Sequence, residues 1–281
     1  MSYTIEELRE KTHSYSRLDC FKQCPMKYKF KYIMGLYTDS KTFPLLIGTL
    51  SHEVLEDKFK RIMEGNYDFS DLVLKYKNGI KEINPPLEEY KTKVNSLIKR
   101  INKEESLGDE WKTFSVEQDI NFKIGEYKMI AKIDRMDISD SGDFRVVDYK
   151  TNNKLYEKKD LGTPMQFVVY ALAIKDKYEK YPVENMYDMI FLNDVQMCLT
   201  DKNWEKKGIY KIKKLFEEIE LCINIDEFHP KPTPLCWWCP YGDENSPNSD
   251  SVYGGICEYR SLWKPNDKTH RKLKEWEGIL K

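Results

Sequence analysis

The sequence RVVDYKTNN, residues 145–153, decides how this chain is interpreted. Two valines predict a buried strand, which ends on Asp148, Tyr149 and Lys150 in direct succession. Because side chains alternate across a strand, Asp148 and Lys150 share one face and Tyr149 lies on the other. A carboxylate and an ammonium placed in this way either form an ion pair at the rim of a sheet or serve as a metal ligand beside a catalytic lysine. This stretch alone leaves both interpretations open.

A second acid, Asp134, is predicted to lie near Asp148. Residues 114–151 predict three strands, with turns at Gly125 and at residues 139–143. The connections are short, so the strands form an antiparallel meander and the second turn brings the two acids together. Two carboxylates at a strand end can hold Mg²⁺, which activates water and offsets charge on the leaving oxygen in phosphodiester hydrolysis. A neighbouring lysine can orient or deprotonate that water and stabilise the transition state.

Helices are predicted on both sides of these strands. Residues 47–63, IGTLSHEVLEDKFKRIM, place four side chains on one helical face: His52, Leu55, Glu56 and Phe59. A helical region at residues 70–102 follows and is interrupted at Pro85 and Pro86. Glu56 shares this face with His52 and is equally compatible with a solvated surface and with a functional role.

The remaining elements complete an α/β pattern. Residues 163–178 predict a helix with Thr163 as N-cap and Pro164 at its first position. A strand at residues 186–197 and an amphipathic helix at residues 204–224 follow. From residue 47 the order is helix, three strands, helix, strand, which is written αβββαβ.

Composition limits the classes of function. The 281 residues suffice for one large domain or two small ones, and a net charge of −1 gives no global attraction to nucleic acid. A DNA-binding groove would therefore require lysines to cluster on one part of the protein surface. No run of about 18 apolar residues and no signal-peptide pattern is present, so we expect no membrane contact and a cytoplasmic location in a prokaryotic or phage-infected host cell. Seven cysteines argue against a disulfide framework and favour metal or cluster ligation.

The pattern from Asp134 to the DYKT of residues 148–151 resembles the PD-(D/E)xK nuclease superfamily. The form IDRMD…VVDYKT is similar to its RecB-like exonuclease branch, which includes CRISPR-associated RecB-like exonucleases and the nuclease domain of AddB. GTLSH, residues 48–52, matches the G-x-x-x-H of that branch, and QFVVY, residues 166–170, matches its Q-x-x-x-Y. The resemblance implies a restriction-endonuclease-like core, with a mixed central sheet flanked by helices.

The resemblance also implies roles for single residues. The ligands of Mg²⁺ or Mn²⁺ would be Asp134, Asp148, the Tyr149 carbonyl and, as a further ligand or a DNA-end contact, His52. Lys150 would be the catalytic lysine. Gln166 and Tyr170, one helical turn apart, would face the active site and hold a phosphate or the lysine. We interpret Asp137, three residues after Asp134, as structural.

The cysteines at the two ends of the chain form a second candidate site. CWWC, Cys236 to Cys239, places two thiolates within reach of one metal or cluster. The resemblance implies a [4Fe–4S] cluster joining the N- and C-terminal segments through four ligands: Cys24, Cys236, Cys239 and Cys257. Seventeen residues, 240–256, separate the last two cysteines, which is longer than the short gap of the relatives. Zn²⁺ on the same thiolates and Cys20 in place of Cys24 remain alternatives.

A lysine-rich aromatic segment, KYKFKYI at residues 27–33, is a candidate contact for single-stranded nucleic acid. The candidate residues are Lys27, Tyr28, Lys29 and Lys31. An amphipathic helix whose aromatic side chains, Tyr28 included, fill the core is the equal alternative.

These features predict a metal-dependent DNA exonuclease acting on single strands or DNA ends, in recombination, repair, phage DNA processing or spacer acquisition. A DNA-end-binding adaptor in a larger complex and a structure-specific endonuclease are the alternatives. Because G-x-x-x-x-G-K-[ST] is absent, unwinding would need a helicase partner; a recombinase or an integrase is a further candidate partner. We predict one domain, residues 1–281, with four parts: a core at 47–200, cluster-binding segments at 14–34 and 228–260, and a helical insertion at 70–112.

Overall fold

The computed structural model describes residues 3–38, 43–83, 88–102, 110–198, 203–242 and 252–258. The chain, predicted as one domain, divides into two compact units. The sheet unit comprises Arg9–Tyr15 and Phe43–Lys214, and the terminal unit comprises Met1–Leu8, Ser16–Thr42 and Leu215–Lys281. The predicted core at 47–200 falls within the sheet unit. The predicted break at Pro85 and Pro86 lies outside the described residues.

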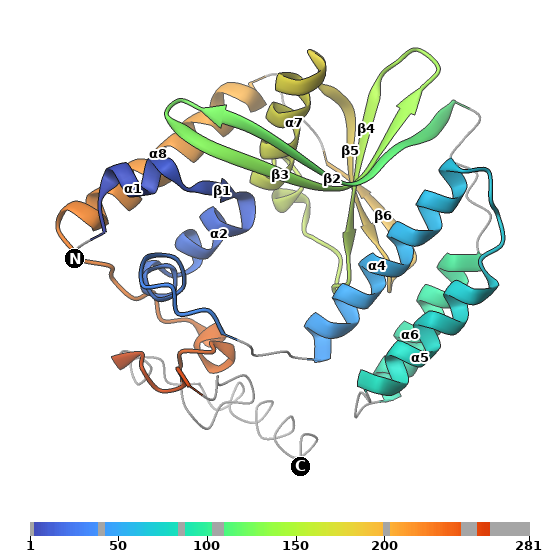
Figure 1. Ribbon diagram of the computed structural model, residues 1–281, viewed down its shortest axis with the longest axis horizontal. Coiled ribbons are helices and arrows are strands. Elements are labelled where there is room, and N and C mark those ends of the chain that lie inside the picture. The colour runs from blue at the N-terminus through green and yellow to red at the C-terminus, as the bar shows by residue number, and fades with distance from the viewer. Residues whose placement is uncertain are drawn as a thin grey trace. The chain divides into compact units, whose positions relative to one another are not determined.

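The predicted meander forms the centre of the sheet unit (Figure 1). Strand β2, Trp111–Ile124, pairs antiparallel with β3, Tyr127–Ser139, which pairs antiparallel with β4, Phe144–Lys150. Gly125 begins the first turn with a φ of 63°, a left-handed conformation that costs glycine little. The three-strand prediction is therefore confirmed.

Three further strands extend the sheet and make it mixed. Strand β5, Pro182–Met189, runs parallel to β4, and β6, Asp194–Met197, runs antiparallel to β5. Strand β1, Thr12–Ser14, pairs parallel with β3. The prediction of one strand at 186–197 is wrong, because the chain reverses just before β6, where Asn193 has a φ of 51° that asparagine tolerates in turns.

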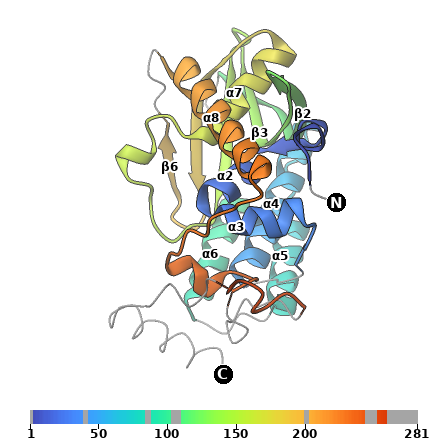
Figure 2. The same ribbon diagram turned by 90° about the vertical axis from the view of Figure 1, so that its left-hand side faces the viewer.

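Three helices cover the face of the sheet on which Tyr149 lies. They are α4, Phe43–Met63; α5, Ser70–Ile83; and α6, Glu88–Asn102, and Figure 2 shows the last two side by side. Leu55 and Phe59 of α4 pack with Val147 and Tyr149 in a fully buried apolar cluster. The helix predicted at 47–63 is confirmed and begins four residues earlier, at Phe43.

Helix α7, Met165–Tyr178, covers the opposite face, after a short 3₁₀-helix η2, Lys158–Asp160. The predicted cap is wrong, because Pro164 is the N-cap and the Thr163 hydroxyl donates instead to the Gly162 carbonyl. Helix α8, Trp204–Asn224, packs on α7 at Gly208, where a Cβ would lie 2.5 Å from Val168 Cγ1.

The terminal unit has a small helical core of its own. Its elements are α1, Ile5–Glu10; α2, Tyr15–Gln23; α3, Pro25–Tyr28; the π-helix η1, Lys29–Ile33; the end of α8; and the 3₁₀-helix η3, Pro234–Trp238. Leu8, Leu18 and Tyr28 are fully buried there. Among the helices of the described residues, none combines the length and the apolar character needed to cross a membrane.

Candidate active site

Asp148 and Lys150 meet at the end of β4, on the face that the sequence predicts. Asp148 is only 1% exposed, and Lys150 Nζ lies 2.5 Å from its Oδ2. Burial alone would lower the pKa of Lys150, but the adjacent carboxylate outweighs burial and raises it. The lysine is therefore a cationic donor in this arrangement.

Helix α7 holds this pair through the predicted Q-x-x-x-Y residues. Gln166 Nε2 and the Tyr170 hydroxyl both donate to Asp148 Oδ1, at 2.7 and 2.9 Å. Lys150 Nζ donates to Gln166 Oε1 at 3.0 Å, which closes the network. The spacing of one helical turn allows both α7 side chains to reach the same carboxylate.

Asp134 lies across from Asp148 where the pairing of β3 with β4 ends. Arg135 pairs with Val147, so the two acids occupy the next position along the two strands. Asp134 Oδ2 accepts a 2.7 Å hydrogen bond from the backbone N–H of Tyr149. Burial, and then the negative charge of Asp148, raise the pKa of Asp134 well above its usual value. A cation at this position would relieve that repulsion.

His52 approaches Asp134 from α4. Its Nδ1 lies 3.6 Å from Asp134 Oδ2, and its ring stands edge-on to Tyr149 with centroids 5.8 Å apart. Burial lowers the pKa of His52, which favours the neutral imidazole that binds metals. The glycine of the same motif, Gly48, faces Thr151 at the end of β4, where a Cβ would lie 3.4 Å from Thr151 Oγ1.

Glu117 of β2 is a site residue that the sequence interpretation missed. Among the described residues, one group of three side chains has the spacing of a metal site, with ligand atoms of His52, Glu117 and Asp134 all within 4.8 Å of one another. Glu117 has a φ of 44°, a strained conformation of the kind that clusters at functional sites. Burial, followed by the nearby acids Glu56 and Asp119, raises its pKa.

The hairpin itself contains the signal for Glu117. Ile124 pairs with Tyr127 across the turn at Gly125. Counting seven residues back from Ile124 and seven forward from Tyr127 gives Glu117 and Asp134, so the turn alone places the two acids opposite each other. Asp148 follows on the next strand, and three carboxylates therefore lie at one level of the sheet.

These side chains line an open cleft of about 680 Å³. Its walls include the metal-spaced group together with Asp148, Lys150 and Gln166. Glu56 also lines the cleft and pairs with Lys60 at 2.5 Å. Asp137 is fully buried and binds Arg145 Nη2 at 2.7 Å and Arg135 Nε at 3.1 Å, as expected for a structural residue.

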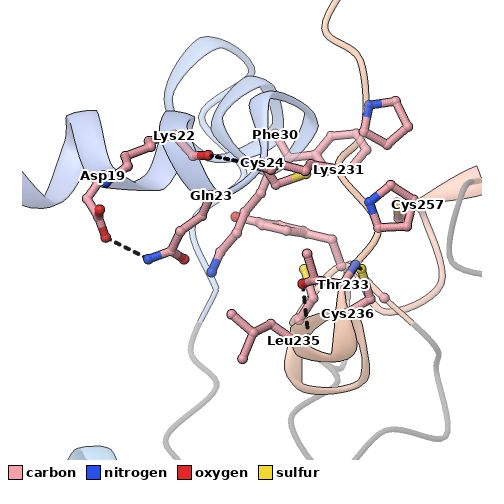
Figure 3. A pocket seen from close by; sticks show the side chains of 16 residues that line it. Asp19, Lys22, Gln23, Cys24, Phe30, Lys231, Thr233, Leu235, Cys236 and Cys257 are labelled. Atoms are coloured by element: carbon pink, nitrogen blue, oxygen red, sulfur yellow. Dashed lines mark hydrogen bonds between the residues drawn. The ribbon is translucent and has the colours of Figure 1, made fainter. Parts of the chain in front are cut away.

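The four predicted cysteines line one cavity of about 300 Å³ in the terminal unit (Figure 3). Cys24 is the residue just before α3, whereas Cys236 and Cys239 lie on and just after η3. Burial raises the pKa of the Cys239 thiol to about 11. Cys20 is buried elsewhere in α2 and does not line the cavity.

Two backbone hydrogen bonds hold residues 255–257 next to the residues that directly follow the CWWC segment. Its N–H donates to the Tyr241 carbonyl at 2.9 Å, and the Gly255 N–H donates to the Gly242 carbonyl at 2.6 Å. Gly242 allows the close turn, because a Cβ there would lie 2.6 Å from the Cys236 carbonyl oxygen. Although residues 240–256 separate Cys239 from Cys257, the last cysteine therefore lies beside the CWWC segment; residues 243–251 lie outside the described part.

The lysine-rich aromatic segment fits the nucleic-acid prediction only in part. Tyr28 is fully buried and its hydroxyl accepts a hydrogen bond from Arg17, so the prediction that it contacts a nucleic acid is wrong. Lys27 lines the cysteine cavity, Lys29 pairs with Asp226 at 2.9 Å, and Lys31 lies over the Tyr32 ring. The roles of these lysines remain predictions.

Comparison with protein families agrees with this geometry. A family model described as the PD-(D/E)XK nuclease superfamily matches residues 12–243. An ATP-dependent helicase/deoxyribonuclease subunit from Clostridium tetani is 23% identical over 206 residues, which cover 59% of this chain and 18% of that protein. A crystal structure from Eubacterium rectale, of a protein provisionally described as an exonuclease, has a TM-score of 0.49 at 15% identity and covers 85% of this chain and 92% of its own.

Proposed function

The chain belongs to the PD-(D/E)XK nuclease superfamily, and from this premise we propose that it is a divalent-metal-dependent DNA exonuclease acting on single strands or DNA ends. The observation that carries the proposal is the meeting of Asp134, Asp148 and Lys150 at one strand end. An ion pair with a purely structural role would need only Asp148 and Lys150. It would not require Asp134, His52 and the hydrogen bonds of Gln166 around it.

The donor set of the cleft fits Mg²⁺ or Mn²⁺. Carboxylate oxygens suit both ions, and a neutral imidazole suits Mn²⁺ in particular. Asp134, His52 and Glu117 would hold the ion, with Asp148 and the Tyr149 carbonyl as the further ligands that the family pattern implies. A bound ion would supply an activated water and would offset charge on the leaving oxygen.

The residues of the chain account for the remaining chemistry. Lys150 is positioned to donate to a phosphate oxygen or to orient the attacking water, and Gln166 fixes its direction. The Tyr170 hydroxyl holds Asp148 in one rotamer, so the carboxylate does not need to reorganise during the reaction.

The test uses linear single-stranded DNA labelled at one end, with Mg²⁺ or Mn²⁺. Wild-type protein should release label, Lys150→Ala should lose at least 100-fold in rate, and Lys154→Ala, a neighbouring exposed lysine, should not. Full activity of Lys150→Ala would reject the site. Circular single-stranded DNA should remain intact, and its cleavage would assign an endonuclease instead.

A second candidate function follows from the Clostridium tetani relative, whose name includes a helicase and of which this chain spans 18%. The chain would then act as the end-processing module of an assembly whose partner unwinds the duplex. A protein inactive on blunt duplex DNA and activated by an added helicase would favour this candidate. Equal activity without the helicase would reject it.

We also propose that Cys24, Cys236, Cys239 and Cys257 hold a [4Fe–4S] cluster in the terminal unit. Among the described residues, no three of these sulfurs lie within 4.8 Å of one another. Four thiolates suit either a [4Fe–4S] cluster or tetrahedral zinc, and the family pattern implies the cluster. Closing the long loop between the first two cysteines would stabilise the unit.

Metal analysis of anaerobically purified protein tests the cluster. About four iron and four sulfide per chain are expected, with a brown colour. Cys257→Ser should lose iron, whereas Cys222→Ser, a cysteine outside the cavity, should retain it. One zinc per chain without sulfide would establish the alternative.

A further inference from the structure

Tyr187 lies beside the catalytic pair on the neighbouring strand. In the parallel register of β4 with β5, Tyr187 pairs with Asp148. Its side chain is 5% exposed, and Lys150 Nζ lies 5.1 Å from the centroid of its ring. A cation at this distance from an aromatic face is attracted by the ring, more strongly when both are shielded from water.

Neighbouring rings fix the position of Tyr187. The Tyr156 ring lies 4.7 Å away and the Phe167 ring 4.8 Å away, centroid to centroid. Tyr156 follows the catalytic strand and Phe167 belongs to α7. The ring therefore has little freedom to turn away from the lysine.

A glutamine on the edge strand secures this arrangement. Gln196 of β6 pairs with Tyr187 in the sheet and binds the backbone of Tyr156 twice. Its Oε1 accepts from the Tyr156 N–H at 2.8 Å, and its Nε2 donates to the Tyr156 carbonyl at 3.0 Å. The loop after the catalytic strand is thereby held over the Tyr187 ring.

We propose that Tyr187 is a positioning residue that holds the Lys150 ammonium at its working position through the face of its ring. The proposal rests on the proposed nuclease function. A lysine side chain has a flexible four-carbon stem and many rotamers, which a fixed partner restricts. An aromatic face attracts the ammonium without adding a negative charge, so it does not compete with the carboxylates for a cation.

Nuclear magnetic resonance tests the contact independently of activity. In protein labelled with ¹³C-lysine, the Hε resonance of Lys150 should shift upfield because it lies over the ring. Lys150→Ala identifies the resonance by its loss. Tyr187→Phe should retain the shift and Tyr187→Leu should remove it. Absence of a shifted Lys150 resonance in the wild type would overturn the proposal, even if the protein cleaves DNA.

Kinetics test the consequence. Tyr187→Leu should lower kcat about 10-fold with KM within two-fold, and Tyr187→Phe should remain within two-fold of wild type in both. Phe144→Leu is the matched control, since Phe144 is a buried aromatic of the same sheet whose ring contacts those of Phe114 and Tyr178. An equal loss in Phe144→Leu would assign the effect to general packing, and an equal loss in Tyr187→Phe would assign it to the hydroxyl. Wild-type protein without any cleavage would reject the proposed function, while the resonance shift would still decide the contact.

Discussion

The backbone N–H of Tyr149 donates a 2.7 Å hydrogen bond to the carboxylate of Asp134. Pairing between β3 and β4 ends at Arg135 and Val147, the residues next to Asp134 and Asp148 on their strands. A side-chain oxygen therefore takes the place of a backbone acceptor where the ladder stops. This bond fixes Asp134 next to Asp148, although burial and like charge disfavour two carboxylates there. The site is assembled at a cost in electrostatic energy, as expected where a cation is to bind.

Asp134→Asn should therefore stabilise the metal-free protein while it abolishes cleavage. The amide keeps the shape and an acceptor for the Tyr149 N–H but removes the charge that Asp148 repels. We expect the melting temperature to rise by roughly 2–4 °C, the shift for about 1 kcal/mol. Cleavage should fall at least 100-fold, since a carboxylate that we propose as a metal ligand is lost.

Calorimetry without metal and an end-label assay check the two halves of this prediction. Asp140→Asn is the control, because Asp140 is an exposed acid beside the same sheet paired with Lys112. It should change neither quantity appreciably. A lower melting temperature for Asp134→Asn would mean that the carboxylate stabilises the metal-free fold, contrary to the raised pKa.

Glu117→Gln should weaken Mn²⁺ binding about 10-fold or more, because one charged ligand of the metal-spaced group is lost. Titration calorimetry with Mn²⁺ alone measures this without substrate. Glu53→Gln, on α4 and in the same cleft but outside the group, should leave the affinity unchanged. Equal affinities of wild type and Glu117→Gln would remove Glu117 from the ligand set.

Tyr170→Phe should reduce kcat about 10-fold, because Asp148 Oδ1 loses one of its two hydrogen-bond donors and Gln166 remains the other. Tyr178→Phe is a matched control on the same helix. Its hydroxyl binds Gln118 at 2.9 Å and does not line the cleft. Single-turnover rates under saturating metal separate the two variants, and similar rates would show that the Tyr170 hydroxyl is dispensable.

Local patterns predicted most of the core, because the periodicity of strands and helices is recorded in neighbouring residues. The meander, α4, α7 and α8 follow from such patterns, whereas Gln166 and Tyr170 were identified through the Q-x-x-x-Y pattern of the family that the chain resembles. The prediction of one strand at 186–197 was wrong because the apolar run continues into a turn, and Asn193 is the residue in that turn with a left-handed backbone conformation. An apolar run by itself contains no information about where the chain reverses.

Contacts between distant segments were harder to predict. Glu117 lies far from the recognised pattern in sequence, and only the hairpin register connects it to Asp134. Tyr28 was ambiguous because alternating lysines and aromatics fit both a binding surface and a core helix, and its burial resolves the choice. The hydrogen bonds between Gln196 and the Tyr156 backbone join strand β6 to a loop 40 residues away, and no local pattern relates the two.

Arg100 and Asp188 form another contact between distant segments that local patterns do not predict. They are a buried ion pair that joins α6 to β5. The Asp188 side chain is 2% exposed and that of Arg100 is 11% exposed, so water can replace neither partner easily. Lys58 Nζ donates to the Arg100 backbone carbonyl at 2.9 Å, which ties α4 to the same point. Removing the carboxylate would take away the buried counter-charge that Asp188 supplies to the guanidinium.

Asp188→Asn should therefore destabilise the sheet unit by about 3–5 kcal/mol, the usual cost of breaking one side of a buried pair. Denaturant unfolding monitored by tryptophan fluorescence measures the change. Asp140→Asn is the control, because Asp140 pairs with Lys112 at 2.9 Å with both side chains more than two-thirds exposed, and its loss should be small. Replacing both buried partners by leucine should recover much of the stability, since both members of the ion pair are then removed together. A loss in Asp188→Asn no larger than that of the control would mean that water reaches Arg100 and that the pair does not hold α6 on the sheet.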